Sequence, residues 1–242
     1  MPNISIIIPA LNEEEVIART VRAVPREHVF EIIVVDNGSS DRTADEARRA
    51  GAVVVSEPRR GYGRACRRGV DSVSPHCDIV VQMDADLSDD PSELPLLLEP
   101  IVQHGYDFVL GSRLLGKREE KSMTPAQVFG SWLASRMLRL IYGIRYTDMG
   151  PFRAIRREAL DSLDLREETY GWSIEMQTKA ASRGLRTLEV PVSWRNRAGG
   201  ESKVAGTVSG SIKAGFRIIW TILRVAYSES REKRAVKTPD PA

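Results

Sequence analysis

The first half of the chain alternates between short apolar runs and stretches in which apolar residues recur at helical spacing. The apolar runs are rich in β-branched residues, and the intervening stretches open on polar residues that are typical of helix starts. Strands that alternate with helices predict an α/β fold built on a mostly parallel, Rossmann-like sheet flanked by helices. The expected strands are residues 4–8, 31–35, 52–56, 78–83 and 107–111, and the expected helices are 13–24, 41–50 and 62–73.

The second half is less regular. Residues 114–124 are charged and contain a glycine, which predicts an exposed, mobile loop beside the sheet, and a proline then opens an amphipathic helix over 125–142. A return strand at 152–155, helices at 157–163 and 172–183, and a strand near 185–194 follow. No internal repeat is visible.

The last quarter predicts a C-terminal amphipathic helix over residues 206–228. Three cations and several glycines interrupt this segment, so it is too polar to span a bilayer, which needs about 20 predominantly apolar residues. The pattern leaves open whether this helix lies on a membrane surface, packs on its own domain or joins a second copy in a homodimer. Residues 229–242 are charged and are expected to be disordered. The stripe consists of Val208, Ile212, Phe216, Ile219, Trp220, Leu223 and Tyr227.

Composition excludes several classes of function. The 242 residues carry a formal net charge of +2, so no global basic field points to a nucleic-acid partner. The two cysteines and three histidines are scattered, which argues against a zinc site and against Ser/His or Cys/His triads. The N-terminus runs directly into a strand without a leader pattern, which predicts an intracellular location.

Polar residues gather just after the expected strands, where parallel sheets bind their ligands. Asp84 and Asp86 follow one buried strand with a single residue between them, so both carboxylates can face one space. Two close carboxylates repel each other unless a cation intervenes, and Mg²⁺ or Mn²⁺ would bind them together with diphosphate oxygens. Two acidic residues at this spacing also occur in solvated turns, so the pair gains weight only from its position.

Other segments at the same edge suggest nucleotide binding. Asp36 opens an Asn-Gly turn that could present its carboxylate to a base or ribose, although such a turn also forms without function. Gly61 and Gly63 are only a fragment of the dinucleotide fingerprint, and no phosphate-binding P-loop motif is present, which disfavours dehydrogenases and P-loop NTPases. Arg113, Arg197 and Lys203 could neutralise phosphate, although each alone is more often a solvated charge.

Taken together, these motifs resemble, in order and spacing, the family 2 glycosyltransferases with the GT-A fold. The later motifs are similar to the branch that makes dolichol-phosphate or polyprenyl-phosphate sugars. The first set consists of residues 6–13, 35–43, 84–86 and 111–113, and the second of residues 147–153, 170–175 and 200–203.

The resemblance implies a role for each matching residue. It places nucleotide binding at Pro9, Ala10, Leu11, Glu13, Asp36, Gly38, Ser39, Gly61 and Asp84, with metal at Asp86, the principal ligand, and Asp84. Phosphate binding falls on Arg113, Arg197 and Lys203, and catalysis on Asp84, Asp86, Arg113, Asp148 and Glu175. The acceptor side falls on Gln127, Ser131, Tyr170 and Trp172.

The sequence departs from the family pattern at four positions in or near these motifs. Asn37 stands where a second Asp is usual, Arg59 replaces a common Asn, and Ser88 replaces a Gln that often assists the metal. Gln127 stands where an Arg would contact lipid phosphate. We therefore expect the metal to rely on the diphosphate and water for much of its coordination.

The implied activity is inverting transfer of a hexose from GDP-mannose or UDP-glucose to a polyprenyl or dolichyl phosphate. Residues 1–205 would form the catalytic domain, with a nucleotide-sugar half (1–113) and an acceptor half (114–205), and residues 206–228 would hold it peripherally at the cytoplasmic face of the plasma membrane. A glycan or small-molecule hydroxyl acceptor is the alternative, and it would need a base such as Asp148 or Glu175. A non-catalytic nucleotide-sugar-binding membrane adaptor is a third reading.

Overall fold

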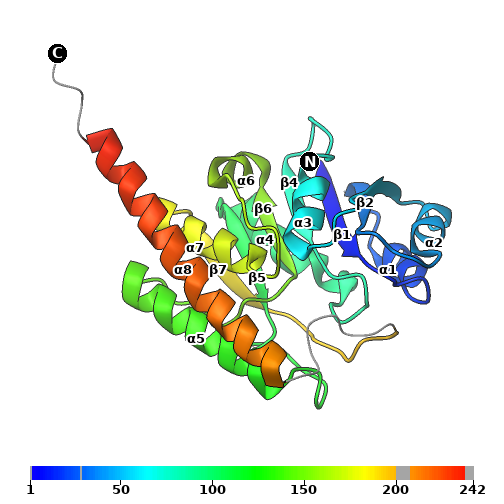
Figure 1. The fold of residues 1–242 in the computed structure, drawn as a ribbon. Helices are drawn as coiled ribbons and strands as arrows, with labels where there is room; N and C mark the ends of the chain where they lie inside the picture. Colours follow the sequence, from blue (N-terminus) through cyan, green and yellow to red (C-terminus); the bar gives the residue numbers. More distant parts are fainter. Residues whose placement is uncertain (1, 28, 200–207, 238–242) are drawn as a thin grey trace.

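A single mixed sheet forms the centre of the molecule (Figure 1). The computed structural model describes residues 2–27, 29–199 and 208–237 and, in the last helix, the side chains of residues 216–231. Over these residues seven strands pair in the order β3-β2-β1-β4-β6-β5-β7, all in parallel except β6, which is antiparallel to β4 and β5. The strands are β1 (Ile4–Ala10), β2 (Val29–Asp36), β3 (Val53–Ser56), β4 (Ile79–Gln82), β5 (Phe108–Ser112), β6 (Arg153–Arg156) and β7 (Thr187–Pro191).

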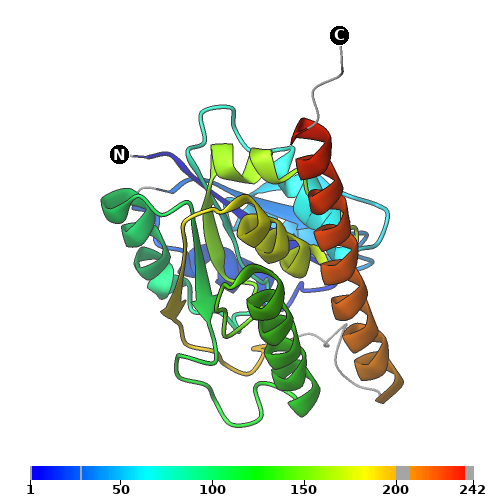
Figure 2. The ribbon, with the colours of Figure 1, turned by 90° about the vertical axis from the view of Figure 1, so that its left-hand side faces the viewer.

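Helices cover both faces of the sheet (Figures 1 and 2). Side chains alternate along β1, so Ile6 and Ile8 face one core and Ile7 faces the other. Each of these isoleucines is fully buried, which contributes about 1.5–3 kcal/mol per side chain. The first core holds α1 (Ile17–Ala23), α2 (Thr43–Arg49) and α4 (Leu94–His104), and the second holds α3 (Tyr62–Val70), α5 (Pro125–Tyr142), α6 (Arg157–Leu163), α7 (Trp172–Arg183) and α8 (Val208–Lys237).

The predicted mostly parallel α/β sheet flanked by helices is confirmed, with shifts at helix ends. The first helix begins at Ile17 and not at residue 13, because the preceding residues form a turn in which Asn12 has a left-handed φ of 52°. Strands β6 and β7 come from the segment expected to form the acceptor half, yet they pair with strands of the first half. The two expected halves therefore share one sheet.

Helices α5 and α8 lie side by side at one end of the molecule (Figures 1 and 2). Helix α5 begins with a capping box, in which Thr124 accepts from the Gln127 amide and the Gln127 side chain accepts from the Thr124 amide. Helix α8 extends to Lys237, so the expectation that disorder begins at residue 229 is wrong, and residues 238–242 lie outside the described residues. Glu229 is buried there against Arg183, with Oε1 and Nη2 2.7 Å apart, and this ion pair anchors the extension. Within the described parts of the chain, no helix is long and apolar enough to cross a membrane.

Candidate active site

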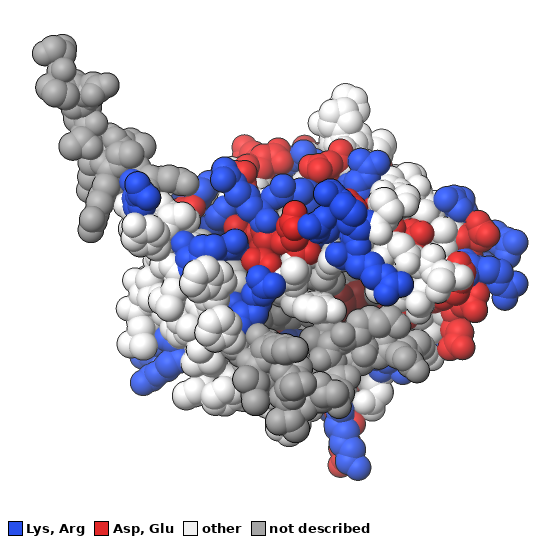
Figure 3. Space-filling model, in the orientation of Figure 1, with Lys and Arg blue, Asp and Glu red and all other residues white. Residues whose placement is uncertain are grey.

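The ends of four parallel strands converge on one edge of the sheet. Ala10 pairs with Asp36 and Asp36 pairs with Ser56 in the register, while β4 ends beside β1 at Gln82. The predicted ligand-binding segments that follow β1, β2, β3 and β4 leave from this edge. Figure 3 shows a recess near the centre of one face, with basic and acidic side chains around it.

The loop after β4 holds Asp86 in a buried, partly satisfied position. Asp86 is 3% exposed, and its Oδ1 accepts from the Ser88 amide at 2.9 Å. Leu87 between them has a left-handed φ of 59°, a conformation that turns the chain back tightly. Asp86 Oδ2 is left for a cation, and it lies 2.6 Å from Nη1 of Arg197.

Two more carboxylates crowd this loop. The amide of Asp84 donates to Asp89 Oδ2 at 3.0 Å, and Asp89 is fully buried. Its Oδ1 has no hydrogen-bond partner among the described residues. Burial and the charge of Asp86 raise the pKa of Asp84 to about 7. Burial and the charge of Asp84 raise the pKa of Asp89 well above its ordinary value.

This crowding fits the predicted divalent cation. Carboxylates whose pKa values are raised by burial and by mutual repulsion are stabilised in their ionised form by a positive charge, and their oxygens are the donors that Mg²⁺ and Mn²⁺ prefer. In the described part of the chain, no group of three or more Asp, Glu, His or Cys side chains is arranged to hold a metal ion. The carboxylates of the loop therefore supply part of a coordination shell, which agrees with the expectation that other oxygens complete it.

Arg197 bridges two predicted site residues. Its guanidinium contacts Asp86 and Glu13, so the turn after β1 and the loop after β4 are joined by one cation. The backbone around Arg197 is also fixed, because the Ala198 amide donates to the Asp86 carbonyl at 3.0 Å and the Arg195 amide to the Ser88 carbonyl at 2.9 Å. The segment after β7 thus lies directly on the carboxylate loop.

Arg113, at the end of β5, forms a buried two-point ion pair with Asp148. Its Nε and Nη2 donate to Asp148 Oδ2 and Oδ1 at 2.7 and 2.8 Å, and its amide also donates to Oδ2 at 3.0 Å. Ser131 and the Met149 amide both donate to Oδ1 at 2.7 Å. The other side of the guanidinium stacks on Trp194, 4.8 Å from the ring centroid. Arg113 is therefore held in one orientation.

These contacts leave Asp148 little capacity to act as a base. Burial alone would raise the pKa of Asp148, but the hydrogen bonds and charge of Arg113 outweigh burial and hold the pKa below its ordinary value. A low-pKa carboxylate whose oxygens already accept five hydrogen bonds is a weak proton acceptor. The geometry makes Asp148 a residue that positions Arg113.

Glu175 is also fully engaged in contacts within the protein. It is 2% exposed, its Oε2 accepts from the amides of Arg166 and Glu167 at 2.9 and 2.6 Å, and its Oε1 lies 3.2 Å from Lys179 Nζ. It secures the turn before α7. A direct catalytic role, expected from the resemblance, has no support in these contacts.

The predicted nucleotide-binding residues interlock at the ends of β1 and β2. Asp36 Oδ1 accepts from the Ser39 amide at 3.0 Å, and Ser39 Oγ accepts from the Asn12 amide at 3.0 Å. Gly38 has a φ of +78°, and a Cβ there would lie 3.2 Å from the Pro58 carbonyl oxygen. Pro9 and Ala10 end β1, and Leu11 and Glu13 follow in the turn. The structure therefore brings these residues together at the ends of β1 and β2.

Asn37 organises the neighbouring loop. Its Nδ2 donates to the carbonyls of Glu57 and Arg59, both at 2.9 Å, and its Oδ1 accepts from the Gly61 amide at 2.8 Å. An Asp could not donate the first two bonds. The departure from the family pattern at residue 37 is thus tied to the course of residues 57–61. Gly61 in turn approaches the Glu168 carbonyl so closely that a Cβ would lie 2.5 Å from its oxygen.

The predicted acceptor-side residues separate into different environments. Gln127 is the partner of the N-cap residue Thr124 in the capping box of α5, and Ser131 is buried against Asp148. Trp172 is buried, with Nε1 3.2 Å from Gln82 Oε1, whereas Tyr170 is half exposed and stacks on Tyr62 with ring centroids 6.5 Å apart. Of these four, Tyr170 is the one with substantial exposure. Lys203 lies outside the described residues.

Sequence reasoning missed Asp89 and Trp194. Asp90 caps the short helix η1 (Pro91–Glu93) through the Ser92 amide, whereas the neighbouring Asp89 turns inward. Trp194 pairs with Asp89 and Arg118 in isolated bridges and donates from Nε1 to the Ser122 carbonyl at 3.0 Å. No local pattern identifies either residue, because both roles depend on segments distant in sequence.

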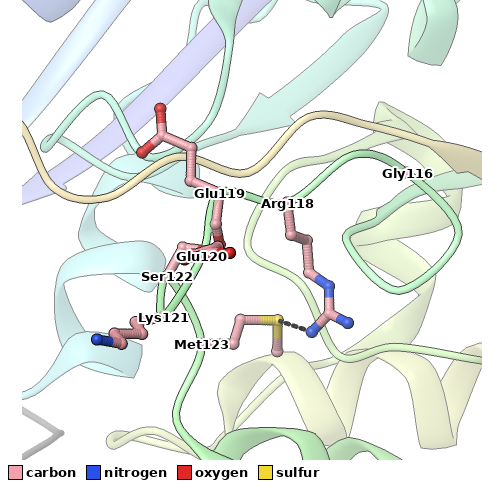
Figure 4. A pocket seen from close by; sticks show the side chains of 7 residues that line it. All are labelled: Gly116, Arg118, Glu119, Glu120, Lys121, Ser122 and Met123. Atoms are coloured by element: carbon pink, nitrogen blue, oxygen red, sulfur yellow. Dashed lines mark hydrogen bonds between the residues drawn. The ribbon is translucent and has the colours of Figure 1, made fainter.

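The predicted exposed loop 114–124 is present and anchored by Trp194. Gly116 and residues 118–123 of this loop line an open hollow, shown in Figure 4, in which Arg118 Nη1 reaches Met123 Sδ at 3.7 Å. This hollow lies within one loop. We therefore locate the candidate site at the sheet edge, where the charged side chains of several elements meet.

Comparisons with known proteins agree with this geometry. The family described as Glycosyl transferase family 2 matches residues 5–164. An uncharacterized glycosyltransferase of Mycobacterium tuberculosis is 38% identical over 87% of this chain and 94% of its own length. An undecaprenyl-phosphate mannosyltransferase of Micrococcus luteus is 32% identical over 84% of this chain and 88% of its own.

A solved structure shares the architecture. Glucosyl-3-phosphoglycerate synthase from Mycobacterium tuberculosis, in complex with Mn²⁺, UDP and glucosyl-3-phosphoglycerate, superposes with a TM-score of 0.73 at 27% identity, covering 93% of this chain and 80% of that one. The expected GT-A architecture is thereby confirmed. The sheet, the acidic loop after β4 and these relatives together establish that the chain belongs to glycosyl transferase family 2.

Proposed function

We propose that the chain transfers a hexose from a nucleoside-diphosphate sugar, GDP-mannose or UDP-glucose, to a polyprenyl or dolichyl phosphate, with inversion at the anomeric carbon. The observation that carries the proposal is the crowded carboxylate loop at residues 84–89. Arg197 faces this loop at the sheet edge, beside the turns after β1 and β2, which hydrogen bonds join. The carboxylates of this loop suit a metal ion, and the guanidinium beside them suits the diphosphate of a metal-bound nucleotide.

Asp86 and Asp84 would hold Mg²⁺ or Mn²⁺. Two observations support this assignment. The pKa of Asp84 is raised by burial and by the charge of Asp86, so a cation would stabilise the ionised pair, and the structural neighbour was solved with Mn²⁺ and UDP. The bound metal would neutralise the diphosphate as it leaves. We assign Asp36, Ser39 and Gly61 to the nucleotide side because hydrogen bonds join the turns that carry them: the Ser39 amide donates to Asp36, the Asn12 amide to Ser39, and the Gly61 amide to Asn37.

Arg113 and Arg197 are suited to stabilise the departing diphosphate. A guanidinium held in place before the reaction stabilises developing charge without reorganising. Arg113 meets this requirement because Asp148 and Trp194 fix it from two sides. Lys203 is proposed to join them on the resemblance alone.

A phosphate acceptor fits the engagement of the carboxylates. A phosphomonoester has a second pKa of about 6 and is mostly dianionic near neutral pH, so it attacks without a general base. A hydroxyl acceptor would need one. Asp148 and Glu175, the two bases considered from sequence, are both committed to other contacts.

The exposed faces of α5 and α8 support a lipid acceptor. Phe129, Trp132, Arg136 and Leu140 recur at helical spacing on α5, and both aromatic side chains are 57% exposed. Phe216, Trp220, Leu223 and Tyr227 recur in the same way on α8. Aromatic side chains mixed with arginines favour the interface of an anionic membrane. We propose that these two stripes hold the enzyme at the cytoplasmic surface of a membrane.

A phosphorylated small-molecule acceptor is the second candidate. It is favoured by the structural neighbour, whose bound product is glucosyl-3-phosphoglycerate. The test is a radiolabelled transfer screen of UDP-glucose and GDP-mannose against polyprenyl phosphate and 3-phosphoglycerate, with Mn²⁺ and with EDTA. Label in the lipid phase supports the first proposal, and label in the phosphoglycerate supports the second. Nucleotide binding by calorimetry without transfer to either acceptor would favour a non-catalytic adaptor.

A further inference from the structure

We infer that Arg197 is an exchangeable internal cation: it occupies Asp86 before the donor binds and is displaced by the divalent metal onto the incoming diphosphate. The inference rests on the proposed metal site at Asp86. It assigns Arg197 two successive partners, whereas the family resemblance assigns it a phosphate alone.

The first support is the competition for one oxygen. Asp86 Oδ1 already accepts from the Ser88 amide at 2.9 Å, so Oδ2 is the oxygen best placed to bind a metal. That oxygen lies 2.6 Å from Arg197 Nη1. A guanidinium and a divalent cation on the same oxygen would repel each other at a separation of a few ångströms, by about 1–4 kcal/mol per unit charge at effective dielectric constants of 80 to 20. The two cations therefore compete for this oxygen.

The second support is the incomplete bonding of the guanidinium. Arg197 contacts Glu13 and Asp86 through its two terminal nitrogens, but its Nε is buried and has no hydrogen-bond partner among the described residues. A buried donor without an acceptor is unfavourable by about 1–3 kcal/mol. A permanent structural ion pair would be expected to satisfy this group. A diphosphate, which offers several anionic oxygens, would supply the missing acceptor.

The third support is that the side chain can move without its backbone. The segment is fixed by amide-to-carbonyl bonds from Arg195 to Ser88 and from Ala198 to Asp86, neither of which involves the Arg197 side chain. The side chain itself is 30% exposed. Exchange therefore requires new rotamers of one side chain and no unfolding of the loop.

The exchange has a thermodynamic consequence. Without donor, a metal ion must displace Arg197, so the affinity of the protein for the metal is lower than its carboxylates alone would give. With donor present, the diphosphate receives the displaced guanidinium, and metal and nucleotide promote each other's binding.

The test measures the affinity of wild type and Arg197→Gln for Mn²⁺. Electron paramagnetic resonance detects the bound Mn²⁺, and no acceptor is present. Without nucleotide, we expect the variant to bind Mn²⁺ about five- to tenfold more tightly, a change expected for removing a half-buried ion pair. With saturating UDP or GDP, we expect its advantage to disappear or reverse. Arg195→Gln is the matched control, because Arg195 pairs with Asp90 on the same segment and should leave Mn²⁺ affinity unchanged.

Raising the salt concentration distinguishes direct exchange at Asp86 from a long-range electrostatic effect of the arginine charge. Salt screens long-range electrostatic interactions strongly and buried ion pairs less. The gain in Arg197→Gln should persist when salt rises from about 0.15 to 0.5 M. Equal Mn²⁺ affinity of wild type and variant without nucleotide would overturn the inference while leaving the metal site intact, as would a gain that vanishes with salt. Absence of Mn²⁺ binding to either protein, even with UDP and GDP, would overturn the metal site as well. Arg197→Lys, which retains the charge, should give an intermediate affinity and guards against misfolding of the Gln variant.

Discussion

Arg113 and Asp148 face each other across the ends of β5 and the segment before β6, with Nε–Oδ2 and Nη2–Oδ1 distances of 2.7 and 2.8 Å. Both side chains are nearly inaccessible to water. A planar guanidinium that meets a carboxylate at two points is fixed in direction as well as in place. The pair turns a long, flexible arginine into a rigid element of the site.

Breaking the ion pair between Arg113 and Asp148 should lower both the free energy of unfolding and the rate of sugar transfer. We expect Asp148→Asn and Arg113→Gln each to reduce the free energy of unfolding by about 3–5 kcal/mol, because each leaves a buried charge unpaired. The double variant should lose less than the sum, which urea denaturation of all four proteins would measure as a coupling energy. The exposed pair Asp45 and Arg48 is the control, and Asp45→Asn should change stability by about 1 kcal/mol or less. Additive losses at residues 113 and 148 would contradict the coupling.

Replacing Asp86 should remove transfer and leave the fold intact. Asp86→Asn keeps the shape and the acceptor oxygen for the Ser88 amide but loses the charge that holds the cation. We expect kcat to fall at least about a thousandfold, the scale seen when a central electrostatic contribution is removed. Asp90→Asn, four residues on and outside the crowded loop, should retain most activity. Substantial Mn²⁺-dependent turnover by Asp86→Asn would remove Asp86 from the metal site.

The raised pKa of Asp84 predicts a pH dependence of stability in metal-free protein. In the unfolded chain this carboxyl ionises near its ordinary pKa of 3.8, but in the folded protein it keeps its proton until about pH 7. Between these values the folded state binds more protons, so its stability falls as pH rises through this window and levels off above about 7. The Asp84→Asn variant has no carboxyl at this position, so it should not lose stability in this way as pH rises.

The measurement is chemical denaturation in EDTA at several pH values between about 5 and 8. The stability of Asp84→Asn relative to wild type should increase with pH up to about 7 and then remain constant. Adding Mn²⁺ with UDP or GDP should reverse the order, because the metal stabilises the ionised wild-type carboxylate. A difference that is independent of pH would show that Asp84 is ionised throughout.

Asn37 should not tolerate the aspartate that is usual in the family. An Asp at this position would place a carboxylate against the carbonyls of Glu57 and Arg59 in place of two donated hydrogen bonds. We expect Asn37→Asp to lose about 1–3 kcal/mol of stability and to weaken nucleotide binding through displacement of residues 57–61. Calorimetric titration with UDP and GDP would measure the second effect. Tighter nucleotide binding would mean that the aspartate contacts the ligand directly.

The exposed stripes of α5 and α8 should govern attachment to vesicles. Trp132→Ser and Trp220→Ser remove half-exposed aromatic side chains, so each should lower sedimentation with vesicles containing anionic lipids, and the double variant should lower it further. Phe30→Ser removes a comparably exposed aromatic side chain from β2 and should have no effect. If all variants bind vesicles equally well, neither stripe takes part in membrane attachment. A change in oligomeric state would instead indicate that the stripe forms a dimer contact.

Local patterns were sufficient for the α/β class and for most strands. Runs such as residues 32–35 and 79–81 are buried on both faces, and a strand of that kind has few alternatives. Because parallel strands end at one edge, the position of Asp84 and Asp86 beside the turns after β1 and β2 also followed from the sequence. The C-terminal extension of α8 did not, because residues 229–237 are polar and Glu229 is buried against Arg183 of a distant helix.

The sequence by itself determined which residues reach the edge of the sheet. The hydrophobic period, the succession of strands and helices along the chain and the spacing of the motifs can all be read from the sequence. Only the tertiary structure decided what those residues do to one another. Asp148 and Glu175 are acidic in sequence, yet contacts with Arg113 and with the turn before α7 commit them to positioning. Asp89 turns inward and Arg197 bridges Glu13 and Asp86 because segments far apart in the chain meet there, and charge at short range depends on distances that spacing along the chain does not specify.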